Sequence, residues 1–173
     1  NKLRALRHIK DISLLKDVRK TDNIKIEAYD VAHFSGRQVV GAMAVVENGE
    51  IDKSAGRYFI LKSFKARKGN DSAGLEEIIS RRLKHQEWPY PDIIAVDGGI
   101  AQFNIANKII REQYPQFNLK VVAITKDDKR KFKKIISSSD IDRDLKKDLI
   151  LSTTEAHKLA TGFNRKKIRE MIE

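Results

Sequence analysis

Two aspartates stand where this sequence could hold a divalent cation. Asp30 lies inside the alternating segment IKIEAYDVA, residues 24–32, where a carboxylate works against strand propensity and is costly to bury unless paired or metal-bound. Asp97 ends the run DIIAVD and precedes Gly98-Gly99, at the carboxyl end of a predicted strand, the edge where α/β sheets bind ligands. If the two strands are neighbours, both carboxylates can converge on one cation. Taken singly, Asp30 could equally be a surface residue, and Asp97 a turn or helix-capping residue.

Three further side chains could join this site. His157 borders the apolar stripe of an expected C-terminal helix, where an imidazole could bind a metal or carry a proton near neutral pH. A lone helical histidine is more often a boundary residue. Asp71 could supply a third carboxylate, but its place before an apolar-periodic segment favours a helix N-cap. His33 follows Asp30 by three residues and could contact either the site or DNA.

This set of residues suits phosphodiester hydrolysis. Carboxylates on adjacent strands can hold cations about 3.5–4 Å apart that activate water and stabilise the leaving oxygen. Clusters of basic residues could hold the nucleic-acid backbone, although solvated loops explain such clusters equally well. The clusters comprise Lys62, Lys65, Arg67 and Lys68, then Lys129, Arg130, Lys131, Lys133 and Lys134 around Phe132, then Arg165, Lys166, Lys167 and Arg169.

The overall charge agrees with a polyanion ligand. The 173 residues carry a formal net charge of +11. Residues 1–70 hold 15 basic and eight acidic side chains, residues 71–118 hold five and seven, and residues 119–173 hold 15 and nine. A basic body around a mildly acidic centre is typical of a polyanion binder with a cation site. The same excess of basic residues could also serve solubility alone.

Several classes of protein are disfavoured. The sequence has no cysteine, which excludes disulfides, thiolate nucleophiles and zinc-thiolate sites and fits a cytoplasmic protein. No apolar run approaches the roughly 20 residues of a membrane span, and no signal peptide opens the chain. A lysine-bearing phosphate loop, a G-x-S-x-G elbow and an H-E-x-x-H motif are also missing. Because the sequence begins at Asn1 rather than methionine, we expect a fragment of a longer protein.

The elements that must position these residues form an α/β pattern. An amphipathic lead-in helix or linker is expected over residues 1–22, followed by one domain over residues 23–173. Three strands with an Asn48-Gly49 turn predict an antiparallel meander, and the later strands are of the buried, parallel kind, so we expect a mixed sheet with flanking helices. Residues 126–150 show little periodicity before Leu145. The expected elements are strands at 24–32, 39–49, 57–64, 93–97 and 119–125, and helices at 73–85, 100–114 and from 145 onward.

Four segments then identify a family resemblance. EAYDVAHFSG, NDSAGLEEIISRR, PDIIAVDGGIAQF and TEAHKLATGFNRKK resemble, in this order, the C-terminal endonuclease domain of UvrC, the nuclease subunit of bacterial nucleotide excision repair. The resemblance extends over nearly the whole chain. It implies an RNase H-like fold and Mg²⁺ or Mn²⁺ as the metal. It further implies a cut in the damaged strand on the 5′ side of the lesion.

The resemblance also assigns roles to residues. Its catalytic positions match Asp30, Asp97, His157 and Asp71, of which the first three would bind the metal. Damaged double-stranded DNA and a UvrB–DNA complex are the implied partners, UvrB being contacted through parts of the full protein outside this chain, with no membrane. The residues expected to bind DNA are His33, Arg57, Lys62, Arg81, Arg82, Gln102, Arg165, Lys166 and Lys167.

The chain departs from the family pattern at three places. Tyr-Arg-Arg-Phe is replaced by Gly56-Arg57-Tyr58-Phe59, a common histidine by Asn164, and the segment after Lys126 is richer in lysine. Because the family's other nuclease, its UvrB-binding segment and its helix-hairpin-helix tail lie outside this chain, we do not expect strong cutting by it alone. Two alternatives stay open: a non-catalytic DNA-docking module on the same fold, and a small-molecule transferase using VDGG as a phosphate-binding turn, which the charge disfavours.

Overall fold

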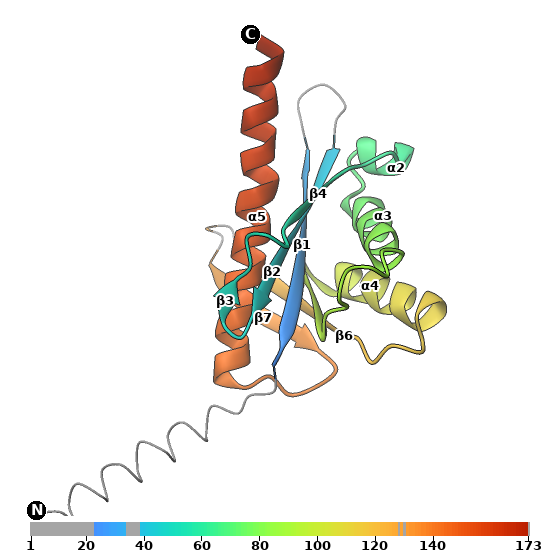
Figure 1. Ribbon diagram of the computed structural model, residues 1–173, viewed down its shortest axis with the longest axis vertical. Helices are drawn as coiled ribbons and strands as arrows, with labels where there is room; N and C mark the ends of the chain where they lie inside the picture. The colour runs from blue at the N-terminus through green and yellow to red at the C-terminus, as the bar shows by residue number, and fades with distance from the viewer. Residues whose placement is uncertain (1–22, 34–38, 128, 130, 173) are drawn as a thin grey trace, which may run out of the picture.

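A single mixed sheet organises the chain in the computed structural model (Figure 1). The structure describes residues 23–33, 39–127, 129 and 131–172, so the expected lead-in helix lies outside the described residues. The elements in chain order are β1 (Lys25–His33), β2 (Val39–Glu47), β3 (Glu50–Ile51), β4 (Arg57–Ile60), α2 (Phe64–Arg67), α3 (Asp71–Leu83), β5 (Ile93–Asp97), α4 (Ile100–Gln113), β6 (Lys120–Lys126), β7 (Phe132–Ser137) and α5 (Arg143–Ile172).

The predicted antiparallel meander is present. β1 pairs with β2, and β2 pairs with β4. Asn48 and Gly49 connect β2 to the short β3 with φ angles of 54° and 80°, the positive values that a two-residue type I′ hairpin turn requires at both positions. The third strand ends at Ile60, before the predicted boundary, because the chain turns there toward α2.

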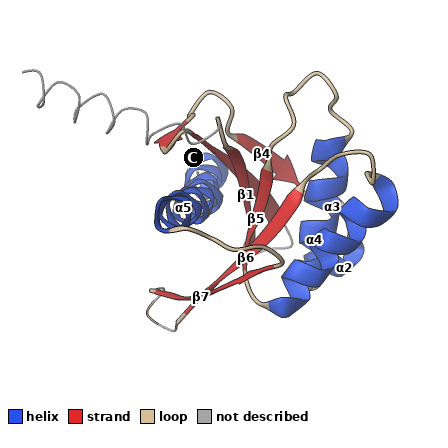
Figure 2. Cartoon of the chain, turned by 90° about the horizontal axis from the view of Figure 1, so that it is seen from below, coloured by secondary structure: helices blue, strands red, loops and turns tan. Residues whose placement is uncertain are grey.

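The second half of the sheet is parallel at its centre. β5 lies beside β1, β6 lies beside β5, and both pairs are parallel. Among the described strands the order is β3-β2-β1-β5-β6-β7, with β4 on β2. α3 and α4 cover one face and α5 covers the other (Figure 2). This arrangement confirms the α/β class expected from the sequence.

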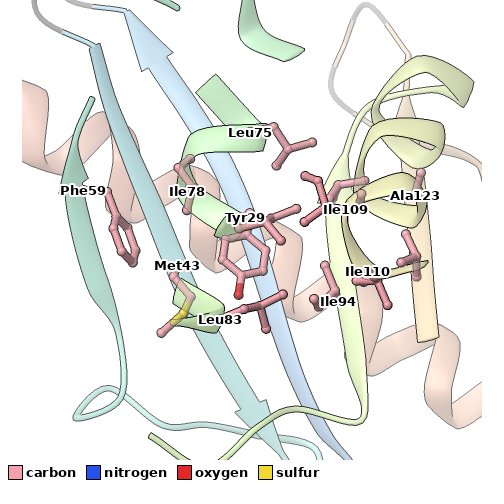
Figure 3. Packing of buried hydrophobic residues seen from close by; sticks show 14 of the residues in the cluster. Tyr29, Met43, Phe59, Leu75, Ile78, Leu83, Ile94, Ile109, Ile110 and Ala123 are labelled. Atoms are coloured by element: carbon pink, nitrogen blue, oxygen red, sulfur yellow. The ribbon is translucent and has the colours of Figure 1, made fainter. Parts of the chain in front are cut away.

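Each face of the sheet has its own apolar core. Alternate residues of β1 point to opposite faces, so Tyr29 packs in the cluster under α3 and α4, whereas Ala28 packs in the cluster under α5. Figure 3 shows the first cluster, in which Ile78 of α3 and Ile109 of α4 face the sheet. No helix within the described ranges combines the length and apolar content needed to cross a bilayer.

β7 is a strand that sequence periodicity missed. It pairs antiparallel with β6, and the register shifts between Thr125 and Lys126. The sequence of β7 is FKKIIS, whose adjacent lysines break the apolar alternation that marks a strand. As an edge strand it needs only one pairing neighbour, and lysine on such an edge protects against unwanted pairing with other chains.

Candidate metal centre and active site

The register between β1 and β5 places the two predicted carboxylates side by side. Tyr29 pairs with Val96 in this parallel ladder, so the next residues, Asp30 and Asp97, end up level with each other. Both side chains lie on the face of the sheet that α5 covers, and each is 15% exposed. The expectation that the two strands are neighbours is confirmed.

α5 brings His157 to the same point. Ala156 and Ala160 are fully buried against the sheet, which lets the helix backbone approach closely. His157 Nδ1 lies 2.7 Å from Asp30 Oδ2, and the Val31 N–H donates to Asp30 Oδ1 at 2.9 Å. One ligand atom from each of Asp30, Asp97 and His157 lies within 4.8 Å of the other two. We call these three residues the triad.

The electrostatics of the triad suit a cation. Burial raises the pKa of the Asp30 carboxyl above its ordinary value, and the neighbouring Asp97 carboxylate also raises it. The hydrogen bond and charge of His157 lower the same pKa without reversing the rise. A positive charge between the carboxylates would relieve their repulsion and favour the ionised form of Asp30.

Lys126 is a site residue that sequence reasoning missed. Its Nζ lies 2.8 Å from Asp97 Oδ2, and its side chain is 12% exposed. A signal was available, because β6 runs parallel to β5 and Lys126 ends β6 just as Asp97 ends β5. The carboxyl ends of parallel strands meet at one edge of a sheet, which makes a charged residue there a candidate.

The two glycines after Asp97 shape the floor of the site. Gly98 has φ of 149°, and a Cβ there would lie 2.7–2.8 Å from the Gln102 side chain. Gln102 Oε1 accepts the Gly99 N–H at 3.0 Å at the start of α4. A small cavity of about 50 Å³ opens beside this turn, lined by Tyr29, Asp30, Val31, Asp71, Leu75, Asp97 and Gln102.

Asp71 lines this cavity, but it is not the helix cap. The favoured N-cap interpretation of Asp71 is wrong, because Asn70 precedes α3 and its side chain accepts the Ala73 N–H at 3.0 Å. Asp71 instead lies in the first turn of α3, where its Oδ1 contacts His33 Nε2. The structure therefore pairs two of the predicted site residues, Asp71 and His33, at the rim of the triad.

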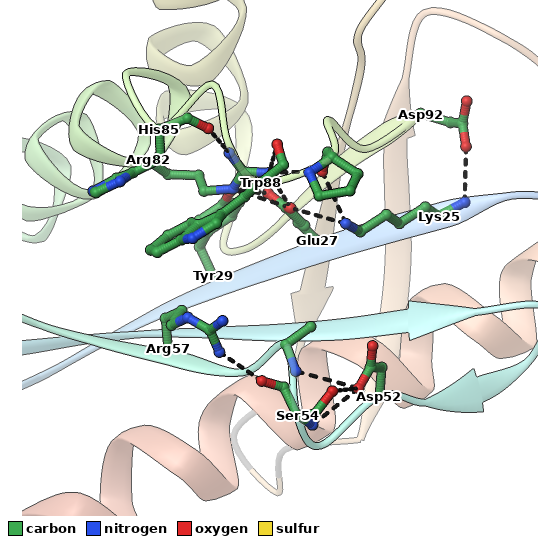
Figure 4. Close-up of polar contacts among 12 residues, drawn as sticks. Lys25, Glu27, Tyr29, Asp52, Ser54, Arg57, Arg82, His85, Trp88 and Asp92 are labelled. Carbon is green, nitrogen blue, oxygen red and sulfur yellow. Dashed lines mark hydrogen bonds and ion pairs between the residues drawn. The ribbon is translucent and has the colours of Figure 1, made fainter.

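The expectation that Arg82 binds DNA is corrected by the structure. Arg82 is fully buried on the α3 face, opposite the triad. Its Nη2 lies 2.7 Å from Glu27 Oε1, and its Nε donates to both Glu27 oxygens (Figure 4). Tyr29 donates to the same carboxylate at 2.6 Å. Arg82 therefore supplies the countercharge of a buried carboxylate and is not accessible to a nucleic acid.

The other predicted DNA contacts are placed differently. Arg57 donates to the carbonyls of Ser54 and Gly56 and lies 4.9 Å from the Trp88 ring centroid. Arg81 donates to the carbonyl of Ile60 and to Glu77. Lys62 is exposed. Arg165, Lys166 and Lys167 belong to the C-terminal part of α5, where the structure does not describe side chains. DNA binding by all of these residues stays a prediction.

Relatives with similar sequences share one name. The UvrABC system protein C of Acetivibrio thermocellus is 30% identical over 181 residues, which cover 88% of this chain and 28% of that protein. The protein of the same name from Caldicellulosiruptor saccharolyticus is 32% identical over 170 residues, covering 94% of this chain and 27% of the relative. The chain thus spans little more than a quarter of the length of these relatives.

Solved structures with a similar fold are nucleases. Human endonuclease V matches with a TM-score of 0.53 and 10% identity, over 86% of this chain and 87% of that one. Ciona intestinalis endonuclease V, in complex with a 24mer DNA containing an inosine followed by a ribo-adenosine, matches with a TM-score of 0.52 and 9% identity, over 88% and 89%. At this identity the likeness concerns the fold alone, and it supports the RNase H-like class.

A comparison with sequence models of protein families identifies the family. The family model of the UvrC RNase H endonuclease domain matches residues 16–167, and the chain therefore belongs to that family.

Proposed function

We propose that this chain is a divalent-metal-dependent DNA endonuclease domain of nucleotide excision repair. The observation that carries the proposal is the convergence of Asp30, Asp97 and His157 from two adjacent strands and a distant helix. Membership of an endonuclease-domain family supports the reaction class. The net charge of +11 supports a polyanionic substrate.

The donor set fits Mg²⁺ or Mn²⁺. Carboxylate oxygens suit these ions, and the chain offers no thiolate that would favour a softer metal. Oxygen ligands lie about 2.1 Å from Mg²⁺, so atoms within 4.8 Å of one another need only a small movement to bind one ion. When bound, the ion would supply Lewis-acid chemistry, lowering the pKa of a water molecule and neutralising charge on the phosphate.

The chain's own residues would then have distinct tasks. Asp30 and Asp97 would bind the metal, and His157 would be a third ligand or a proton carrier at Nδ1, the atom that faces Asp30. Asp71, held by His33, would orient water or substrate at the rim of the cavity. Lys126 balances the charge of Asp97 and would compete with the metal for that carboxylate.

Family membership supports finer features of the proposed reaction. We propose that the cut falls in the damaged strand on the 5′ side of the lesion. The substrate would be damaged double-stranded DNA delivered in a UvrB–DNA complex, with UvrB contacted through regions of the longer protein. The cytoplasm is the proposed setting of the reaction.

The test is a calorimetric titration of Mn²⁺ into the protein and three variants. Asp30→Asn and Asp97→Asn each remove one proposed ligand. Glu112→Gln is the matched control, because it removes one negative charge from an exposed position at the end of α4. Circular dichroism would first establish that every variant is folded. We expect saturable binding in the wild type and in Glu112→Gln, and no binding in either aspartate variant.

If Asp30→Asn and Asp97→Asn both bound Mn²⁺ as tightly as the wild type, the proposal would be contradicted. Absence of binding without DNA calls for the same titration with a short duplex present, since a phosphate can complete a metal site. If Mn²⁺ still fails to bind, the chain is better described as a DNA-docking module on a nuclease fold.

A further inference from the structure

The turn end of the β6–β7 hairpin lies beside the triad. Lys126, the last residue of β6, is joined to Asp97 by the ion pair at 2.8 Å. Lys126 pairs with Phe132 in the ladder, which leaves residues 127–131 as the connection between the strands. Figure 2 shows the hairpin running out from the sheet on the side away from α3 and α4. The turn of the hairpin therefore lies next to the proposed site of chemistry.

Hydrogen bonds give the hairpin a defined shape. The Asp127 N–H donates to the Lys131 carbonyl at 2.8 Å. Asp127 Oδ1 also accepts the N–H of Lys129 at 2.9 Å and that of Lys131 at 2.8 Å. Lys146 of α5 lies with its Nζ 4.2 Å from the centroid of the Phe132 ring, which holds the hairpin against the helix. The Asp127 carboxylate thus serves to close the turn.

The hairpin presents a concentrated positive charge to solvent. Residues 126–134 contain six basic and two acidic side chains. Lys129, Lys131, Lys133 and Lys134 are exposed, and none of the four forms an ion pair with a carboxylate in the described part of the chain. Like charges so close together repel one another, and a polyanion would relieve that repulsion.

The chemistry of these lysines suits a nucleic-acid backbone. Lys129 and Lys131 lie in the connection between the two strands, and Lys133 and Lys134 are adjacent residues near the start of β7. Lysine ammonium groups bind phosphates as point charges without reading bases. A hairpin of this kind would hold the backbone irrespective of sequence, as a nuclease directed to lesions requires.

We propose that the β6–β7 hairpin is a phosphate-binding arm. It binds the DNA backbone next to the phosphodiester that is cut at the triad. The proposal rests on the proposed function, because it takes DNA as the substrate that reaches Asp30 and Asp97. Lys126 links the arm to the triad, and the four exposed lysines supply the contacts.

The experiment compares two quadruple variants with equal charge. The first carries Lys129→Gln, Lys131→Gln, Lys133→Gln and Lys134→Gln. The control carries Lys53→Gln, Lys84→Gln, Lys108→Gln and Lys147→Gln, which are exposed positions outside the hairpin. Binding of a fluorescent duplex is measured by anisotropy over a range of salt concentrations, in EDTA so that no metal is needed. Each lost phosphate contact lowers the slope of log affinity against log salt by about 0.9.

We expect the hairpin variant to lose about two to four units of this slope and at least about tenfold in affinity, while the control keeps its slope. An unchanged slope in the hairpin variant, or equal losses in both variants, would overturn the arm. Mn²⁺ titration of the same variants separates this outcome from the proposed function. Loss of DNA binding with Mn²⁺ binding intact supports the arm, whereas failure of Mn²⁺ to bind in every protein affects only the nuclease assignment.

A cross-linking measurement locates the contact. Because the chain has no cysteine, Lys131→Cys introduces a single thiol, and Lys108→Cys places one on α4 as a control. Each variant is incubated with duplexes that carry, at successive phosphates, a tether ending in a mixed disulfide, so that the protein thiolate attacks the tether sulfur and releases the small thiol. We expect Lys131→Cys to form disulfides at a few adjacent phosphates and Lys108→Cys to form none above background. Equal trapping by the two variants would contradict the proposed arm.

Discussion

Removal of the Lys126 ammonium should make the triad a better metal site. Lys126 Nζ and Asp97 Oδ2 are 2.8 Å apart with side chains only 12% and 15% exposed. At an effective dielectric constant of about 20, unit charges at this distance attract by about 6 kcal/mol. When the two charged groups separate, their hydration offsets much of that attraction. Hydrogen bonds to charged groups therefore contribute a net of about 1.5–3 kcal/mol. A metal ion entering at Asp97 must overcome this net amount.

We therefore expect Lys126→Met to bind Mn²⁺ about 10- to 100-fold more tightly, since each 1.4 kcal/mol is about tenfold. The variant also leaves Asp97 without its countercharge, so its melting temperature in EDTA should fall and recover with Mn²⁺. Isothermal titration calorimetry measures the affinity and calorimetric melting the stability.

Lys147→Met is the matched control. Lys147 also lies 2.8 Å from a carboxylate, that of Asp144, but the two side chains are 68% and 76% exposed, and exposed pairs contribute little. Its Mn²⁺ affinity should change by less than about twofold. If folded Lys126→Met bound Mn²⁺ no more tightly than the wild type, the ammonium would not be a competitor for Asp97 and the reasoning would fail.

Three further predictions concern stability. Arg82→Met removes the cationic partner of the buried Glu27 carboxylate and should lower the free energy of unfolding, measured in urea, by about 3–5 kcal/mol. The double variant Arg82→Met with Glu27→Gln should recover most of this loss. Equal losses in the single and double variants would mean that packing, rather than charge, dominates. Asn70→Ala removes the cap of α3 and should cost about 1 kcal/mol, measured in the same way, with no loss expected if the cap were at Asp71. Burial raises the pKa of the Asp30 carboxyl, so the folded protein keeps this proton to higher pH than the unfolded chain does. The stability of the metal-free protein in EDTA should therefore decline as the pH rises from the ordinary pKa to the raised one. Asp30→Asn should flatten that decline in thermal melts recorded from pH 4 to 7, and an unaltered decline would argue against the raised pKa.

Two members of the triad, Asp30 and Asp97, could be predicted from the sequence because they follow simple periodic rules. Asp30 interrupts an alternating strand and Asp97 ends a buried one, so a parallel register was enough to join them. The placement of both aspartates uses only the geometry of strands, which does not depend on distant contacts. Periodicity alone favoured a boundary residue at His157, and the family resemblance assigned it to the site.

The remainder depended on tertiary contacts that periodicity does not report. Arg82 shares the apolar face of α3 with Leu75, Ile78 and Ile79, which could have suggested burial, but its partner Glu27 lies 55 residues away. Lys126 and β7 were missed because the segment after β6 is rich in lysine, and a strand at a sheet edge needs little apolar content. Asp71 was assigned to the cap because Asn70, one position earlier, is an equally good capping residue.

The buried pair of Glu27 and Arg82 has a consequence for the fidelity of folding. Glu27 and Asp30 are three positions apart on β1 and therefore project from opposite faces of the sheet. A slip of β1 by one residue would exchange the faces, pressing Asp30 into the apolar layer under α3 and α4 and turning Glu27 away from Arg82. Both charges would then be buried without partners, at a cost comparable to the whole stability of a small domain. The Glu27–Arg82 pair therefore favours the native register of β1 and, with it, the face of the sheet on which Asp30 lies.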